Sequence, residues 1–244
     1  LLPSGYTQLE YIESTGTQYI DTGYVGNHLC RASFVGVLTE NYPTGGKESW
    51  HTLFGSDSAV LKRAFSFWVN DTSYNYSPVL SYDGQASYNS IYANVPVELN
   101  KLFTAELNQG HFTLFYNDTP NTNLYDYTME IRGFTTPSSI ILGASYRNGS
   151  LIAPYKSFSI GKVYSFKIWD NNVLVRNFIP AMRNSDSKVG MYDTVTGQFF
   201  TNAGTGEFIA GPRFVEYIEF DGNSWINTGI TQQTCRIEFG VEFI

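Results

Sequence analysis

A stretch near the start of the chain occurs again near its end. Leu9–Gly23 and Val215–Gly229 share Glu-Tyr-Ile-Glu at the same place and end on the same Thr-Gly pair, at an offset of 215 − 9 = 206 residues. Solenoid repeats have periods of roughly 20–50 residues, so a period of this length indicates a tandem domain. We therefore expect one complete module in residues 1–212, followed in 213–244 by the opening strands of a second, truncated repeat.

The segment 213–244 is too short to hold a core of its own. Unpaired strands tend to associate, so it either lost its domain by truncation of a longer tandem protein or packs or swaps as an extension of the first module. Truncation is the interpretation we favour. The two cysteines, Cys30 and Cys235, occupy equivalent repeat positions, which excludes a disulfide framework and predicts two unpaired strand cysteines.

The composition of the chain argues against several classes of binding partner. The formal net charge is −7, which argues against nucleic acid and anionic lipid, because both require a basic surface. No run approaches the roughly 20 apolar residues of a membrane span, so membrane insertion is not expected. Tyrosine and phenylalanine number 18 each while charged residues make up only 15%, a mixture that favours strands and turns over helices.

Alternating segments predict the individual strands. Leu29–Leu38 and Phe65–Asn70 alternate in the way of half-buried strands, and Leu9–Ile12 and Thr17–Asp21 read as two short strands. A hairpin is expected where two such segments flank a short loop with a glycine, namely Leu102–Leu107 and His111–Tyr116 around Asn108-Gln109-Gly110. About a dozen strands of this kind and no convincing helix point to an all-β protein with two stacked sheets.

One long strand is expected near the end of the module. Lys162–Trp169 would face Tyr164, Phe166 and Ile168 inward, with Val163, Ser165, Lys167 and Trp169 outward. Asp170-Asn171-Asn172 would turn the chain into a second strand, Val173–Ile179, because asparagine tolerates the left-handed backbone of such turns.

This hairpin carries a family resemblance. Gly161–Arg183 resembles the last long hairpin of laminin-G-like, concanavalin A-like lectin and glucanase domains, with further similar blocks at Leu2–Ile12, Gly190–Gly197 and Asn202–Gly206. The resemblance covers nearly the whole first module and implies a two-sheet antiparallel jelly-roll sandwich whose first strands pair near its last ones. The module is similar to a group found in gut bacterial surface proteins and phage tail-associated proteins, which implies an extracellular place on a bacterial cell surface or a virion.

The acidic residues do not form a hydrolase pattern. Hydrolases of this fold use Glu and Asp alternating on one strand face, and glycoside hydrolysis needs two carboxylates across the bond. The nearest match, Asp126, Thr128 and Glu130, is read as a solvated strand face. The histidines at 28, 51 and 111 show no metal or triad spacing, so we expect no enzyme, no catalytic residue and no cofactor.

Calcium, bound at the rim of the sandwich, is the one metal ion for which the sequence offers candidate ligands. Asp57, Asp71 and Asp118 are turn or loop acids that could hold it, although they form no dense acidic cluster.

Aromatic residues among amides and hydroxyls are the candidates for ligand binding. Sugars are bound by rings against their C–H faces and by polar side chains at their hydroxyls. Seven residues fit this description, on two strands and in two loops: Trp68, Tyr88, Tyr92, Tyr42, Trp50, Tyr146 and Arg147. Aromatic residues at strand spacing more often pack in a core or an interface, and packing is the commoner role for Trp68 as well.

The sequence thus predicts a non-catalytic recognition or adhesion module of a larger tandem protein, with a glycan or surface receptor and neighbouring domains of the same chain as partners. A homo-oligomer stays open. The alternatives are a ligand-free structural spacer of a virion or surface protein and an accessory domain of a polysaccharide-degrading enzyme.

Overall fold

The computed structural model describes residues 2–40, 50–58, 63–70, 75–80, 89–90, 93–96, 98–118, 123–128, 133–147, 150–151 and 160–214. All of them belong to one compact unit that ends at Phe214. The second copy of the repeat and Cys235 lie outside the described residues, as do Tyr42, Tyr88 and Tyr92. The predictions made for them therefore stay predictions.

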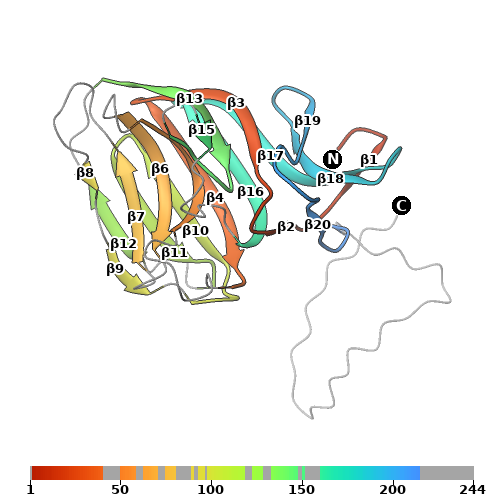
Figure 1. Cartoon of the computed structure of the whole chain (residues 1–244), viewed down its shortest axis with the longest axis horizontal. Coiled ribbons are helices and arrows are strands. Elements are labelled where there is room, and N and C mark those ends of the chain that lie inside the picture. The colour runs from red at the N-terminus through yellow and green to blue at the C-terminus, as the bar shows by residue number, and fades with distance from the viewer. Residues whose placement is uncertain are drawn as a thin grey trace, which may run out of the picture. The chain divides into compact units, whose positions relative to one another are not determined.

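The described residues form twenty strands and no helix, divided between two sheets (Figure 1). The eleven-stranded sheet runs in the order β12 (Asn123–Thr128), β11 (His111–Tyr116), β10 (Phe103–Asn108), β4 (Cys30–Leu38), β16 (Ile160–Asp170), β17 (Val173–Arg183), β18 (Lys188–Asp193) and β19 (Gln198–Thr201). Three short strands join it, with β1 (Tyr6–Gln8) on β17, β2 (Ile12–Thr15) on β16, and β20 (Ile209–Ala210) on β2.

The nine-stranded sheet runs in the order β15 (Ser150–Leu151), β14 (Tyr146–Arg147), β5 (Trp50–Ser58), β6 (Arg63–Asn70), β7 (Asn75–Leu80) and β8 (Asn89–Ser90). Off this path, β13 (Thr135–Leu142) pairs with β5 and β3 (Ile20–Asn27), and β9 (Ala93–Pro96) pairs with β7. All pairings in the two sheets are antiparallel except the short one between β14 and β5. No helix in the described part of the chain could cross a membrane.

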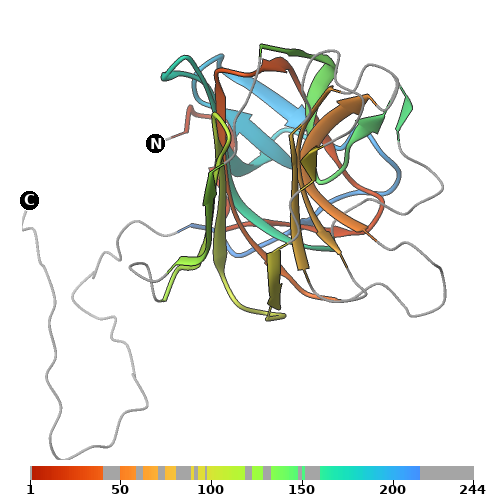
Figure 2. The same ribbon diagram turned by 90° about the vertical axis from the view of Figure 1, so that its left-hand side faces the viewer.

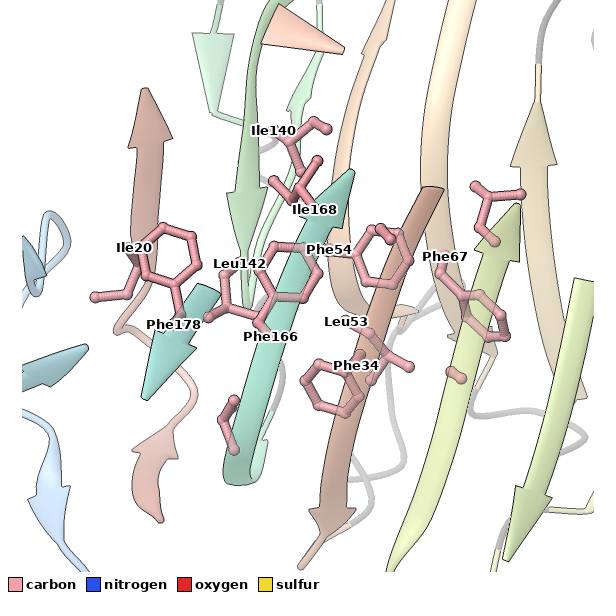
Figure 3. Close-up of a cluster of buried hydrophobic side chains, with 14 of the residues drawn as sticks. Ile20, Phe34, Leu53, Phe54, Phe67, Ile140, Leu142, Phe166, Ile168 and Phe178 are labelled. Atoms are coloured by element: carbon pink, nitrogen blue, oxygen red, sulfur yellow. The ribbon is translucent and has the colours of Figure 1, made fainter. Parts of the chain in front are cut away.

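The two sheets face each other as layers and bury a phenylalanine-rich core between them (Figure 2). Phe54 of β5 meets Phe166 of β16 with ring centroids 5.2 Å apart, and Phe166 stacks on Phe178 of the neighbouring strand (Figure 3). Offset and tilted ring contacts of this kind stabilise a core beyond the area they bury. The prediction of a two-sheet antiparallel jelly-roll sandwich is confirmed.

Local sequence patterns explain much of this architecture. In β4, Cys30, Ala32 and Phe34 point into the core while the residues between them do not, as the alternation predicts. The expected hairpin between β10 and β11 is present, and its loop is the two residues Gln109 and Gly110, both with positive φ. Two residues with positive φ are what a type I′ turn requires, because that turn matches the twist of the strands it joins.

The long hairpin is also present, with one error in its predicted faces. Asn171 and Asn172 have φ of 45° and 64° and form the expected turn between β16 and β17. Val163, predicted to face outward, is 7% exposed and belongs to the core. Tyr164, predicted to face inward, instead meets Tyr11 at a ring distance of 5.3 Å. The reason is a bulge against β4 between Val163 and Ser165, which reverses the alternation before it.

The start of the chain differs from the prediction in its strand bounds. The backbone N–H of Leu9 donates to the carbonyl of Pro180 and that of Glu10 donates to the carbonyl of Pro212, so this segment joins its partners between strands β1 and β2. Phe214 N–H closes the same ladder on the carbonyl of Gln8 at 2.9 Å. The pairing of the first strands with the last ones, implied by the family resemblance, is observed (Figure 1).

Candidate functional site

Four of the seven predicted binding residues lie on three neighbouring strands of the nine-stranded sheet. Trp68 is in β6, and Trp50 in β5 stands opposite Asn70 of β6. Tyr146 and Arg147 form β14, where Arg147 stands opposite Asp57 of β5. Strand β8 follows Tyr88 directly and belongs to the same sheet.

Trp68 stands on the side of its sheet that faces away from the core. Phe65 and Phe67 of the same strand are 1% exposed and belong to the core, whereas Trp68 is half-buried. Because successive side chains of a strand point to opposite faces, Ser66 and Trp68 share the outer face. The side chain of Trp68 therefore lies outside the sandwich core, with its Nε1 buried.

Polar side chains are buried on the same face of the sheet as this indole. In the antiparallel ladder Thr52 stands opposite Trp68, Gly55 opposite Ser66, and Asp57 opposite Ala64, and directly opposed residues share a face. Thr52 and Ser66 are fully buried and Asp57 is 1% exposed. We call Thr52, Gly55, Asp57, Ser66 and Trp68 the Trp68 face.

Gly55 lets the hydroxyl groups of this face approach the backbone. A Cβ atom at position 55 would lie 2.3 Å from the Ser66 Oγ and 3.2 Å from the Ser145 Oγ, and Ser145 is itself fully buried. Few real Cβ atoms have such neighbours, so any larger residue would displace the serine side chains. A large ring beside several precisely held polar groups is the composition that small-molecule sites share.

The opposite sheet carries a polar surface that the sequence did not single out. The guanidinium carbon of Arg31 lies 4.4 Å from the ring centroid of Trp169, and Arg31 Nη2 donates to Glu106 Oε1 at 2.6 Å. Further along, His111 Nε2 lies 2.8 Å from Asp126 Oδ1. The outward position of Trp169 was predicted, but its contact with Arg31 depends on the register of β16 against β4, which no local pattern reveals.

Two carboxylates outside these faces, one buried and one partly buried, have structural partners. Asp193 is fully buried, and its carboxylate accepts the N–H of Asn177 at 2.8 Å, the N–H of Val195 at 3.1 Å and the hydroxyl of Thr196 at 2.7 Å. Arg176 Nε lies 3.6 Å away. Asp193 belongs to one of the blocks that carry the family resemblance, and these bonds give it the role of holding the turn after β18.

Asp170 has a similar role at the other end of the long hairpin. It accepts the hydroxyl of Tyr24 at 2.6 Å and the amide of Asn27 at 3.1 Å. Burial, and then the hydrogen bond to Asp170, raise the pKa of Tyr24. Cys30 lies beside this group with its Sγ accepting the N–H of Asn27 at 3.3 Å, and burial raises the pKa of its thiol to about 11.

The residues predicted for calcium are spread over the fold. Asp57 is inside β5, Asp118 follows β11 with Lys101 Nζ 3.8 Å away, and Asp71 lies outside the described residues. Nowhere in the described part of the chain do three or more His, Cys, Asp or Glu side chains gather as a metal site would require.

Comparison with known proteins identifies the fold. No family model and no curated protein matches the sequence. Among solved structures, the chain is similar to a proposed carbohydrate-binding protein from Bacteroides ovatus ATCC 8483, with a TM-score of 0.52 and 12% identity, over 86% of this chain and 61% of that one. The chain thus spans less than two thirds of the length of that protein.

Weaker similarity extends to two further groups. One is the CBM40 of Ruminococcus gnavus IT-sialidase, solved with α2,3 sialyllactose, with a TM-score of 0.46 and 14% identity over 66% of this chain and 90% of that one. The other is the heptameric SAP-like pentraxin of Limulus polyphemus, with a TM-score of 0.43 and 9% identity over 85% and 94%. From its two antiparallel sheets and its likeness to the B. ovatus structure, this chain has the jelly-roll sandwich fold of concanavalin A-like domains.

Proposed function

We propose that this chain is a non-catalytic glycan-binding module of a larger tandem protein on a bacterial surface or a phage tail, and that the Trp68 face holds the glycan. The observation that carries the proposal is the place of Trp68, which is half-buried on the side of the sheet opposite the core, with Thr52 directly opposite it in the ladder and Ser66 on the same face.

The chemistry of the Trp68 face suits a saccharide. An indole offers a flat apolar surface to the C–H face of a pyranose ring. Arg147, another of the predicted binding residues, stands opposite Asp57 in the ladder between β14 and β5.

The known relatives of the fold support the same class of ligand. The B. ovatus protein is described as a proposed carbohydrate-binding protein, and it shares the sandwich over 86% of this chain. The carboxylates of Asp193 and Asp170 support a non-catalytic role, because both are engaged by backbone, hydroxyl or amide donors of the fold.

The test is binding of the full chain to a glycan array, followed by titration calorimetry with the strongest ligand. Trp68→Ala should weaken binding by about 2 kcal/mol or more, roughly 30-fold, as expected for a central aromatic contact. Tyr127→Ala is the matched control, because Tyr127 is another partly exposed aromatic residue, 43% exposed, on the opposite sheet. Circular dichroism of each variant checks that the sandwich is intact.

Two results would contradict the proposal. If the chain binds no glycan on the array, the result would favour a ligand-free spacer. Binding that is equally strong in the wild type and in folded Trp68→Ala would place the glycan elsewhere on the module.

A further inference from the structure

The outer face of the eleven-stranded sheet carries two neighbouring rows of polar positions at its centre. Strands β16, β4 and β10 place Trp169, Arg31 and Asn108 opposite one another in one row, and Lys167, Ser33 and Glu106 in the next. None of the six is buried, and only Trp169 is not a purely polar residue. We call these six residues the polar grid.

Arg31 is held in place from two sides. Its guanidinium lies over the ring of Trp169 at 4.4 Å and bonds Glu106 at 2.6 Å, with the side chains of Arg31 and Glu106 35% and 22% exposed. Among the described residues Glu106 supplies the one acceptor that the Arg31 side chain bonds. Since a guanidinium has five N–H donors in a fixed plane, Arg31 keeps further N–H donors in a fixed orientation, of which the one on Nε is buried.

Two lysines of β16, Lys162 and Lys167, have no ion pair with a residue that the structure describes, but the Lys162 ammonium lies over the Tyr11 ring at 4.5 Å. Arg31 is paired with Glu106, and His111 with Asp126. Lys167, which stands between Ser33 and Asn177 in the ladder, has no ion pair with any residue that the structure describes. At the centre of the sheet the Lys167 ammonium thus has no anionic partner among the described residues. On a chain with a net charge of −7, it favours a ligand with a negative group at that point.

We propose that the polar grid is a second binding site, specific for a saccharide that carries a carboxylate. The Lys167 ammonium and the open N–H donors of Arg31 bind the carboxylate, the Trp169 ring contacts the sugar, and Ser33 and Asn108 bond its hydroxyls. Arginine suits the carboxylate because its planar donors match two carboxylate oxygens. The site is distinct from the Trp68 face and stands whether or not that face binds a glycan.

The two sites lie on the outer faces of opposite sheets, so they face away from each other across the sandwich (Figure 2). One module could then bind two glycan chains at once. Two modules could also bind the same long glycan chain. Linked binding events of this kind raise overall affinity without any new contact.

The experiment is titration calorimetry of the full chain with tri-galacturonic acid and with its methyl ester, which keeps the sugar and removes the charge. The acid should bind at least about tenfold more tightly than the ester, and its affinity should fall as sodium chloride is added. Sialyllactose against lactose is the second arm, and it separates a sialic acid from a uronic acid as the source of the carboxylate.

Variants assign the binding to the grid. Lys167→Gln and Arg31→Lys should each weaken binding of the acid at least about tenfold, the second because lysine lacks the planar fork. Lys188→Gln, at a lysine that is already paired with Glu207, should leave the affinity unchanged. Trp68→Ala should leave it unchanged too, which separates this site from the Trp68 face.

Failure of both acidic saccharides to bind would overturn the proposal. So would an affinity that is the same in the wild type and in Lys167→Gln, or equal binding of the acid and its ester.

Discussion

Removing the carboxylate of Asp193 should destabilise the module strongly. Asp193→Ala leaves the N–H groups of Asn177 and Val195 and the hydroxyl of Thr196 without their acceptor, in a place that is fully buried. A hydrogen bond to a charged group contributes about 1.5–3 kcal/mol, and breaking a buried ion pair costs about 3–5 kcal/mol. These bonds share one carboxylate and are not additive, so we expect a loss of about 3–5 kcal/mol.

Thermal unfolding measures this loss. For a domain of this size each kcal/mol lowers Tm by about 2–4 °C, so Asp193→Ala should melt roughly 6–20 °C below the wild type in scanning calorimetry. The Tm of Asp193→Asn should lie between those of Asp193→Ala and the wild type, because the asparagine amide keeps one acceptor oxygen and loses the charge. Asp186→Asn is the control, an exposed acid whose loss should cost less than about 0.5 kcal/mol. A Tm of Asp193→Ala within about 2 °C of the wild type would refute the structural role given to this residue.

Two further predictions concern the core. In the Cys235→Ser variant, where Cys30 is the remaining thiol, no thiol should react with a disulfide reagent at pH 8 until the protein unfolds, since burial raises the pKa of Cys30 to about 11. The pKa of Cys30 is higher in the folded than in the unfolded protein, so its contribution to stability is complete below about pH 9 and is lost as the pH rises to 11. The free energy of unfolding in urea should therefore decline less over this pH range in Cys30→Ala than in the parent protein. An equal decline in the two proteins would exclude the thiol as its cause. Phe54→Ala removes a ring whose centroid lies 5.2 Å from that of Phe166, and it should lower the free energy of unfolding by about 3–5 kcal/mol in the same urea assay. Phe214 is 49% exposed, so Phe214→Ala should lower it by less than about 1 kcal/mol. Similar losses in the two variants would contradict the assignment of the core.

Local chemistry made the sandwich predictable. The alternation in Cys30–Leu38 and the turn residues Gly110, Asn171 and Asn172 depend on neighbours in sequence, and the structure contains them as expected. The bulge at Val163 was not predictable, because an extra residue is placed by the partner strand and leaves no mark in the pattern of its own strand. The predicted side-chain alternation was therefore wrong on one side of the bulge and right on the other.

The candidate sites were predictable only in part, for the same reason. Trp68 and Trp169 could be assigned to outer faces from the spacing within their own strands. The neighbours that give each tryptophan its chemistry come from other strands: Thr52 opposite Trp68 from the preceding strand, and Arg31 opposite Trp169 from a strand far away in sequence. Their placement depends on register, which is set when whole strands pair.

The ladder that joins the two ends of the module determines how it responds to tension. Phe214 and Gln8 stand at the open end of an antiparallel ladder that continues through Arg213 and Leu9 to β20 and β2. Pulling the two ends apart therefore loads one hydrogen bond at a time, starting at Phe214, while β1 stays fixed on β17. Residues 209–214 would peel away first and release roughly 20 Å of chain before any force reaches the phenylalanine core. In the proposed glycan-binding role, this last segment would detach and pair again under tension while the two sheets stay folded.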